Sequence, residues 1–231
     1  MSKDFNTNFF KTWSSEMAYI LGYTFADGSL YKNTHGYYYL EYTSTDAELI
    51  EKVRKLLGSS HKISFRLREK DNPNYKNCYR IQIGARLIVE DLEKLGVIQN
   101  KSLVAKFPEV PRAYIGDFVR GYFDGDGGVN LKQYWRKSRN NWNWVFTTQF
   151  TSGSKDFLDG LRKSLKGRVV GGQIRQKHQR GGFDFILSRH DSLALFKLMY
   201  DNAPVDMLLK RKYNIFLKAF EVLKYNIAGV A

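Results

Sequence analysis

Residues 20–28 read ILGYTFADG, and residues 119–127 read VRGYFDGDG. Both stretches have glycine in third place, tyrosine in fourth place and Asp-Gly at the end. The similarity continues downstream, where the tripeptide YTS at 42–44 is answered by FTS at 150–152. Because self-similarity along a chain is typical of repeated structural units, the sequence predicts two copies of one unit.

The pattern of apolar residues predicts the same order of elements in each copy. We expect each copy to consist of a helix, two strands, a helix, two strands and a helix. The fold class is therefore α+β. The first half then covers residues 1–100 and the second 112–231, with a linker at 101–111. The later helices are predicted at 46–57, 87–95, 155–165 and 193–200, and the later strands at 61–69, 77–84, 168–178 and 182–188. The segment KQYWRKSRNNWNW at 132–144 predicts a longer, basic and aromatic hairpin in the second copy.

Small residues recur every fourth position in both motif segments. The first helix is predicted to begin near Ser14 or Ser15 and to stop at Gly28; the second begins after Pro111 and stops at Gly127 or Gly128. A glycine inside a helix costs about 1 kcal/mol relative to alanine, so another interaction must offset that cost. Close packing of the two helix backbones would do so. The small residues on the shared face are Ala18, Gly22, Ala26, Gly121 and Gly125.

Parallel packing of the two helices would bring Asp27 and Asp126 to the same end. Two neighbouring carboxylates repel each other, and a divalent cation removes that penalty. Carboxylate oxygens together with water suit Mg²⁺, and Mn²⁺ or Ca²⁺ can substitute for it. A calcium loop of the helix–loop–helix type is excluded, because its twelfth position, counted from Asp124, is Trp135 rather than a glutamate.

The charge balance points to a polyanionic partner. Lys and Arg number 37 against 23 for Asp and Glu, which gives a formal net charge of +14. Nucleic acid is the first candidate and an anionic membrane surface the second. Cys78 is the only cysteine, so neither an internal disulfide nor a cysteine-based zinc site is possible. No stretch approaches the roughly 20 apolar residues of a membrane helix, and the N-terminus does not read as a signal peptide. We therefore expect an intracellular protein, cytoplasmic or organellar, without membrane contact.

The two nonapeptides inside this repeat resemble the motifs of LAGLIDADG homing endonucleases of the monomeric, two-motif type. The resemblance covers nearly the whole chain, from about residue 14 to 225. It implies a pseudo-twofold tandem αββαββα repeat, in which two saddle-forming antiparallel sheets are joined by the paired motif helices. It also implies an Mg²⁺-dependent, site-specific endonuclease of intron homing that cuts both strands of a long double-stranded DNA site as a monomer.

The resemblance further implies the residues of the active site. The family's catalytic acid is the eighth motif residue, which falls on Asp27 and Asp126. The carbonyl groups of the preceding residues, Ala26 and Gly125, are expected to add metal ligands. The family's lysine falls on Lys101 in the first half, and on Lys212 in the second, where Lys210 stays open as an alternative. The polar residues that order active-site water in relatives fall on Glu41 and Gln149.

Strand alternation predicts which side chains face DNA. The opposite parity is apolar and is expected to face the core; it includes Ile63, Phe65 and Leu67. The basic clusters at 136–139 and 175–180 are expected to hold phosphates rather than to read bases. The predicted DNA-binding residues are Tyr31, Asn33, Tyr37, Tyr39, Lys62, Ser64, Arg66, Arg68, Arg80 and Gln82 in the first half, and Asn130, Lys132, Arg136, Arg139, Thr147, Gln173, Arg175 and Lys177 in the second.

Other functions compete with the endonuclease interpretation. An intron maturase, which binds folded intron RNA, is the main alternative on the same fold. A catalytically silent DNA-binding regulator would be expected to lose one of the two acids, and both are present. An intein is disfavoured because the chain has no nucleophile at its N-terminus and does not end in His-Asn. A generic basic α+β domain explains the charge but not the doubled motif.

Overall fold

The computed structural model describes residues 4–68, 70, 72–177 and 181–225. The chain divides into two compact units, residues 1–126 and 127–231, and each is described by itself. The second motif helix belongs to the first unit, where it packs on the first motif helix.

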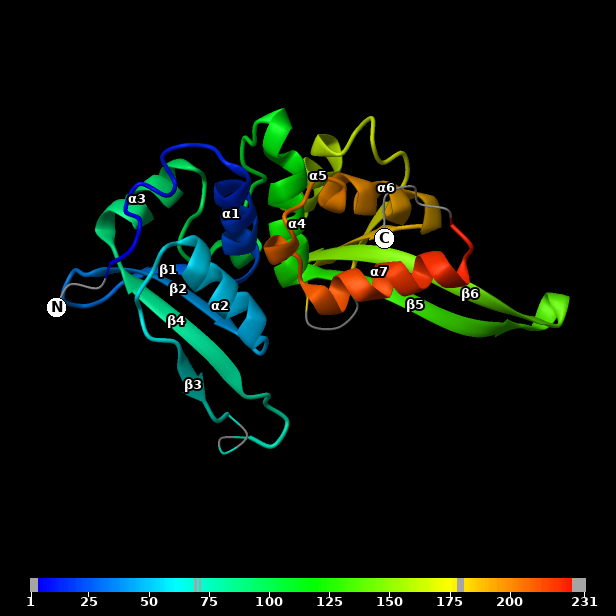
Figure 1. The fold of residues 1–231 in the computed structure, drawn as a ribbon, viewed down its shortest axis with the longest axis horizontal. Helices are drawn as coiled ribbons and strands as arrows, with labels where there is room; N and C mark the ends of the chain where they lie inside the picture. The colour runs from blue at the N-terminus through cyan, green and yellow to red at the C-terminus, as the bar shows by residue number, and fades with distance from the viewer. Residues whose placement is uncertain (1–3, 69, 71, 178–180, 226–231) are drawn as a thin grey trace. The chain divides into compact units, whose positions relative to one another are not determined.

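The first unit contains one antiparallel sheet with strand order β1-β2-β4-β3. Helix α2 packs on β2 and β4, and helix α3 packs on β2 (Figure 1). The elements are α1 (Ser15–Asp27), β1 (Gly28–Lys32), β2 (Tyr38–Ser44), α2 (Ala47–Leu56), β3 (Ser64–Arg66), β4 (Cys78–Gly84), α3 (Arg86–Lys94) and α4 (Ile115–Asp126), with short 3₁₀ turns at Lys101–Leu103 and Arg112–Tyr114.

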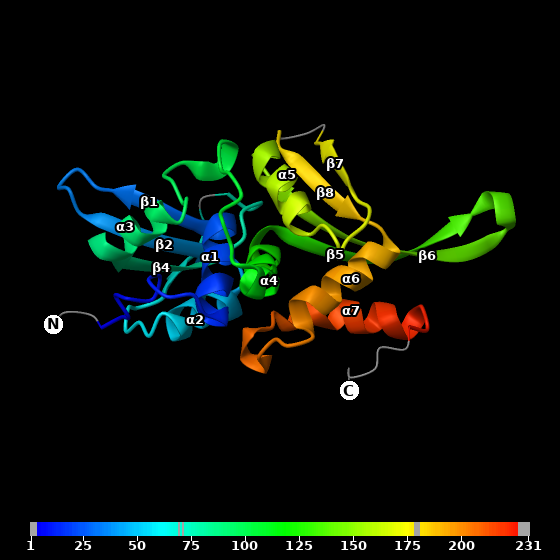
Figure 2. The ribbon, with the colours of Figure 1, turned by 90° about the horizontal axis from the view of Figure 1, so that it is seen from above.

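The second unit repeats this sheet with the order β5-β6-β8-β7. Helices α5 and α6 pack on β6 and β8, and α7 packs on β5 (Figure 2). The elements are β5 (Gly127–Arg136), β6 (Asn141–Ser152), α5 (Lys155–Ser164), β7 (Gln173–Gln176), β8 (Phe183–Leu187), α6 (Arg189–Tyr200) and α7 (Lys210–Val222), with 3₁₀ turns at Lys137–Arg139 and Val205–Met207.

The predicted order of helices and strands is confirmed in both copies. One element goes beyond it, because helix α7 follows the second copy. Its Phe216 and Phe220 pack edge-on against Phe146 of β6, with ring centroids 5.8 and 6.2 Å apart. Helix α7 therefore covers part of the core face of the second sheet.

The core of each unit lies between its sheet and its helices. In the first unit, inward positions on the three longer strands are almost fully buried, as alternation predicts. These are Leu30, Leu40, Tyr42, Ile81 and Ile83. In the second unit, the buried inward side chains of β6 and β8 include Phe146, Phe150, Phe185 and Leu187.

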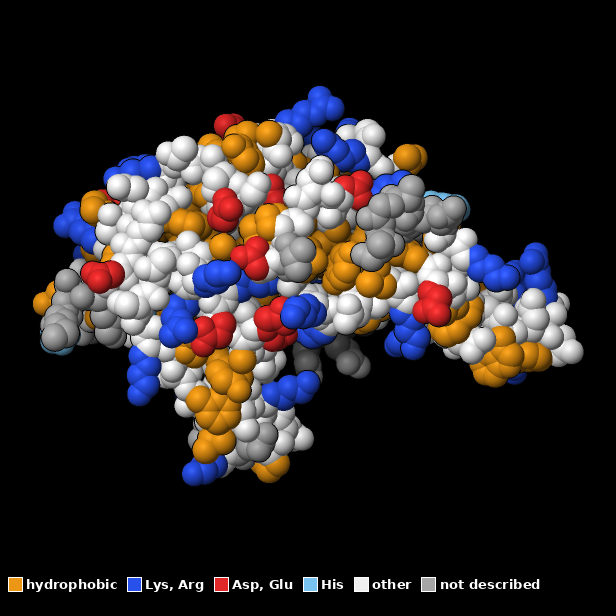
Figure 3. Space-filling view, viewed as in Figure 1, with side chains coloured by type: hydrophobic (Ala, Val, Ile, Leu, Met, Phe, Trp, Pro, Cys, Tyr) orange, Lys and Arg blue, Asp and Glu red, His pale blue; other side chains and the backbone are white. Residues whose placement is uncertain are grey.

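The expectation that Phe65 and Leu67 face the core is wrong. Their exposed fractions are 53% and 46%. The physical reason is that β3 is a three-residue edge strand, whereas α2 and α3 pack chiefly on β2 and β4. Phe65 instead contacts Tyr79 on the neighbouring strand, with ring centroids 5.1 Å apart. Figure 3 shows the resulting apolar side chains at this end of the sheet, beside lysines and arginines.

Candidate active site and nucleic-acid interface

Helices α1 and α4 pack with their backbones in direct contact at two glycines. A Cβ atom on Gly22 would lie 2.9 Å from the backbone nitrogen of Tyr122, and a Cβ on Gly121 would lie 3.0 Å from that of Tyr23. Each glycine also lies against a carbonyl group of the other helix, at Phe118 and Tyr19 respectively. Such distances are shorter than real side chains show, so only glycine allows this approach.

The same relation continues toward the C-terminal ends of the two helices, which therefore run in parallel. A Cβ on Gly125 would collide with the methyl group of Ala26 and would lie 3.1 Å from Oδ2 of Asp27. The carboxylate of Asp27 consequently lies against Gly125 in the last turn of α4. Gly125 immediately precedes Asp126. Ala18 is fully buried on the same stripe of α1.

The first helix ends differently from the predicted glycine cap. Gly28 has a φ of −76° rather than a positive value, and the chain passes directly from α1 into β1. Glycine is needed here because a Cβ would lie 2.7 Å from the side chain and carbonyl of Thr24. The abrupt transition from helix to strand places Asp27 at the junction. At the other end of α1, the Ser14 hydroxyl accepts a hydrogen bond from the Met17 N–H, as expected of an N-cap.

Lys101 reaches the helix ends from the 3₁₀ turn after α3. The residue is 9% exposed, and its ammonium group donates to the carbonyl oxygen of Gly28. Burial lowers the pKa of Lys101, while the charges of Asp126 and Asp27 oppose that shift. The lysine therefore lies within the electrostatic influence of both acids. Next to it is an open cavity of about 290 Å³, with a lining of Ala26–Leu30, Ile98 and Asn100–Ser102.

In the second unit, the structure distinguishes Lys212 from Lys210. Lys212 is 4% exposed and donates to the carbonyl oxygen of Gly127 over 2.6 Å. Gly127 follows Asp126 in the chain, as Gly28 follows Asp27. Lys210, at the start of α7, is exposed. The buried contact to the glycine after the acid is thus shared by Lys101 and Lys212.

Glu41 and Gln149 occupy the same place in their sheets but differ in surroundings. Glu41 pairs in register with Ser29 and Gln82, and its Oε2 accepts from Arg80 over 2.5 Å. Gln149 pairs with Gly128 and Ile186. The side chain of Gln149 lies over Gly128, where a Cβ would be 3.2 Å from its Cγ.

The outer face of the first sheet is polar, and strand register brings most of the predicted DNA-binding residues onto it. Asn33 differs from the others, because its Oδ1 accepts from the backbone of His35 and Tyr37 and closes the β1–β2 turn. Arg68 lies beyond β3 with its guanidinium over the ring of Tyr75. Lys62 is exposed before β3. The residues sharing the outer face by register are Ser29, Tyr31, Tyr39, Glu41, Ser64, Arg66, Arg80 and Gln82.

The second sheet also has a polar outer face, and its hairpin is longer. Strand β5 has 10 residues where β1 has 5, and it ends in a turn carrying Arg139. Arg175 is oriented by two hydrogen bonds to Oε1 of Gln173, and Lys177 lies 3.6 Å from Asp184. Residues 178–180 of the predicted phosphate-binding cluster lie outside the described residues. The predicted residues on this outer face by register are Asn130, Lys132, Arg136, Thr147, Gln173 and Arg175.

A buried polar network between α1 and α4 escaped the sequence analysis. The Tyr19 hydroxyl donates to Oδ2 of Asp124 over 2.7 Å, and Arg120 pairs with Asp117 over 2.6 Å. The Arg120 guanidinium lies over the Tyr19 ring, 5.5 Å from its centroid. Burial, followed by the charge of Asp124, raises the pKa of Tyr19 well above its usual value. The only signal in the sequence was the presence of charged residues among the apolar residues of helix α4.

Fold and site together define a tandem-repeat α+β protein in which two glycine-bearing helices pack closely and each ends in an acid. A family model described as LAGLIDADG-like domain matches residues 14–96 and again 113–197. The chain belongs to this LAGLIDADG family.

Solved structures of this family share the fold. The meganuclease I-AabMI, bound to uncleaved DNA, has a TM-score of 0.61 and 11% identity, with coverage of 89% of this chain and 90% of that one. The homing endonuclease I-LtrWI, bound to target DNA, has a TM-score of 0.60 and 13% identity, with coverage of 95% and 92%.

A curated relative matches by sequence. The DNA-directed RNA polymerase subunit Rpo1C of Methanocaldococcus jannaschii is 28% identical over 148 residues, which is 63% of this chain. The match spans 15% of that subunit's length. Within the described part of this chain, no helix has the length and apolar character needed to cross a bilayer.

Proposed function

We propose that this protein is a site-specific homing endonuclease that hydrolyses both strands of a long double-stranded DNA site. One observation carries the proposal: an acid stands at the end of each of two helices in backbone contact, with a buried lysine under the influence of both acids. Paired carboxylates can hold a divalent ion, and the ion can support phosphoryl chemistry.

The donor set at the helix ends fits a divalent metal ion. In the described residues, no cluster of three or more His, Cys, Asp or Glu side chains could hold a metal by itself. Asp27 and Asp126, with the carbonyl groups of Ala26 and Gly125, would leave positions for water and phosphate oxygens, as Mg²⁺ prefers. A bound divalent ion would lower the pKa of a water molecule and neutralise charge on the phosphate.

The remaining steps fall to the protein's own side chains. Hydrolysis replaces a sugar oxygen on phosphorus with a water oxygen, and negative charge increases on the phosphate as this happens. Lys101 and Lys212 would stabilise that charge, since each ammonium is held beside the glycine that follows an acid. Gln149, over Gly128 at the start of β5, would orient the attacking water in its half of the site.

The polar outer faces of the two sheets would hold the DNA. Both solved relatives described above are bound to DNA. In this chain, arginines, lysines and amides lie on one face of each sheet and can contact phosphates and base edges in the major groove. The net charge of +14 would favour association with DNA at low salt.

The test is cleavage of a plasmid carrying the uninterrupted locus that flanks the gene. We expect linearisation by the wild-type protein with Mg²⁺ and none with EDTA. Asp27→Asn and Asp126→Asn should each abolish double-strand cleavage while DNA binding by gel shift stays within a few-fold of wild type. Asp201→Asn, the same change at an exposed position after α6, is the matched control and should cut normally.

Two outcomes would contradict the proposal. If Asp27→Asn linearises the plasmid at the wild-type rate, Asp27 is not part of a metal site that cleavage requires. Absence of cleavage by the wild-type protein, together with tight binding of the intron RNA, would favour the maturase interpretation.

A further inference from the structure

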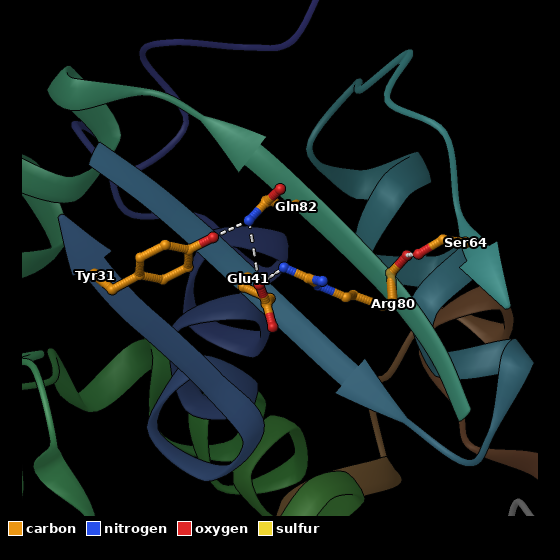
Figure 4. A network of polar contacts seen from close by, with 5 residues as sticks. All are labelled: Tyr31, Glu41, Ser64, Arg80 and Gln82. Atoms are coloured by element: carbon orange, nitrogen blue, oxygen red, sulfur yellow. Dashed lines mark hydrogen bonds and ion pairs between the residues drawn. The ribbon is translucent and has the colours of Figure 1, made fainter. Parts of the chain in front are cut away.

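Four side chains form a connected polar network at the centre of the first sheet's outer face: Tyr31 of β1, Glu41 of β2, and Arg80 and Gln82 of β4 (Figure 4). Arg80 donates from one terminal nitrogen to Oε2 of Glu41 over 2.5 Å. Nε2 of Gln82 donates to the same carboxylate oxygen over 3.4 Å and also to the hydroxyl of Tyr31. We call these residues the Glu41 network.

The Glu41 network determines which atoms Gln82 presents. A carboxylate can only accept hydrogen bonds, so the Gln82 amide must turn its nitrogen, not its oxygen, toward Glu41. Both amide hydrogens are then used, one by Glu41 and one by Tyr31. The carbonyl oxygen of Gln82 remains as the group available to a ligand, so Gln82 acts as an acceptor.

Arg80, in contrast to Gln82, acts as a hydrogen-bond donor. Glu41 engages one nitrogen of its guanidinium, and the hydrogen bond to Glu41 is the main reason why the pKa of Arg80 is raised. The group stays charged and retains further N–H donors in a fixed plane. Arg80 and Gln82 are two residues apart on one strand, so they present a donor and an acceptor side by side.

The second sheet lacks this arrangement. By register, Gln149 stands where Glu41 does, Ile186 stands where Gln82 does, and Asp184 stands where Arg80 does. Asp184 is engaged by the hydroxyl of Thr151 over 2.6 Å. The Glu41 network is therefore specific to the first half, and the chain contains its own comparison site.

Arg80 offers at least two donors in one plane with the Gln82 acceptor beside them, and this order of groups matches one base pair in the major groove. Guanine presents two acceptors there, N7 and O6, and its partner cytosine presents the N4 amino donor. An A·T pair presents an acceptor, a donor and an acceptor in turn, so the adenine N6 amino group would oppose a donor of Arg80 and the thymine O4 would oppose the carbonyl oxygen of Gln82. Gln82 cannot pair bidentately with adenine, because its donors are already used.

We propose that Arg80 and Gln82 read a single G·C base pair, with Arg80 on guanine and Gln82 on cytosine, and that Glu41 is the positioning residue that fixes both. This inference rests on the proposed function and adds the base pair that this site selects. It also gives Glu41 a different task from that of Gln149.

The experiment selects bound DNA from a random-sequence duplex pool in Ca²⁺ buffer and sequences it, for the wild type and for each variant. We expect the wild type to enrich a motif with a strongly preferred G·C pair at one position. Arg80→Ala should lower that preference about tenfold or more, and Glu41→Ala should lower it by roughly two- to tenfold at the same position, with other positions unchanged. The double variant Glu41→Ala, Arg80→Ala should lose no more of the G·C preference than Arg80→Ala alone.

Two further variants separate positioning from folding and from catalysis. Glu41→Gln keeps the shape and an acceptor for Arg80, so it should retain more of the preference than Glu41→Ala and melt within a few degrees of wild type. Gln149→Ala should leave the whole motif unchanged and alter only the cleavage rate.

The outcomes are distinguishable. If the wild type enriches a motif that Arg80→Ala leaves unchanged at every position, the base-reading claim fails while the endonuclease proposal stands. If Arg80→Ala relaxes one position but Glu41→Ala relaxes none, Glu41 is not a positioning residue. If the wild type enriches no motif, the proposed function itself fails.

Discussion

Replacing Gly22 with alanine would place a methyl group against the backbone of α4. Its carbon would lie 2.9 Å from both the carbonyl carbon of Phe118 and the nitrogen of Tyr122. The carbonyl oxygen of Phe118 would be closer still, and ordinary contacts between heavy atoms are about 3.5–4.0 Å, so α1 and α4 would have to separate by about 1 Å or more. Backbone atoms cannot rotate away as side chains do, so the whole helix pair must move.

The magnitude follows from two opposing effects. Alanine is favoured over glycine inside a helix by about 1 kcal/mol. Overpacking a well-packed core costs about 1–3 kcal/mol, and a clash with backbone belongs at the upper end of that range. We expect Gly22→Ala to lower the free energy of unfolding by about 2 kcal/mol, or the melting temperature by about 4–8 °C.

Urea unfolding followed by far-ultraviolet circular dichroism measures this change. Gly84→Ala is the matched control, because its added carbon would meet only the ring of Tyr39, at ordinary distances of 3.5 and 3.8 Å. It should shift stability by no more than about 0.5 kcal/mol. Gly121→Ala should behave like Gly22→Ala, and the double variant should lose less than the sum, because one separation of the helices relieves both clashes. If Gly22→Ala is as stable as the wild type, close backbone packing is not what requires glycine here.

Three further predictions concern the lysines, the buried network and the hairpin. Lys212→Met should lower the rate of DNA cleavage at least tenfold in single-turnover assays, whereas Lys210→Met should leave it within about twofold, because only Lys212 is buried on the Gly127 carbonyl; equal effects would contradict this. Tyr19→Phe should destabilise the protein by about 1–3 kcal/mol in urea unfolding, since it removes the hydroxyl that donates to buried Asp124; Tyr37→Phe, at a ring that is 65% exposed, is the control and should be neutral. The double variant Arg136→Ala, Arg139→Ala should weaken DNA binding uniformly across sequences and reduce the slope of log affinity against log salt by about 2; an unchanged slope would show that the hairpin does not contact phosphates.

The Glu41 network shows what residue patterns can and cannot predict. Strand alternation correctly placed Arg80 and Gln82 on the outer face, because side chains on a strand alternate strictly between faces. It could not show that both contact Glu41, because strand register between β2 and β4 joins residues about 40 positions apart. The choice between Lys210 and Lys212 had the same origin, since only the packing of α7 decides which lysine is buried.

Errors arose where an element lies at the edge of the sheet. Phe65 and Leu67 follow the alternation of a half-buried strand, yet both are exposed, because alternation marks a face without showing that a helix covers it. The end of α1 was predicted at the right residue for the wrong reason. Gly28 is required by contact with Thr24 and not by a left-handed backbone.

The sequence by itself determined the repeat, the order of its elements, the two motif helices and the acid at the end of each, because these are local patterns of residue type with a fixed period. The tertiary structure alone decided which backbone atoms the glycines touch, which lysine is buried against the glycine that follows an acid, and which polar groups on the sheet contact one another. Those features depend on distances between segments remote in the chain, and no local pattern encodes such distances.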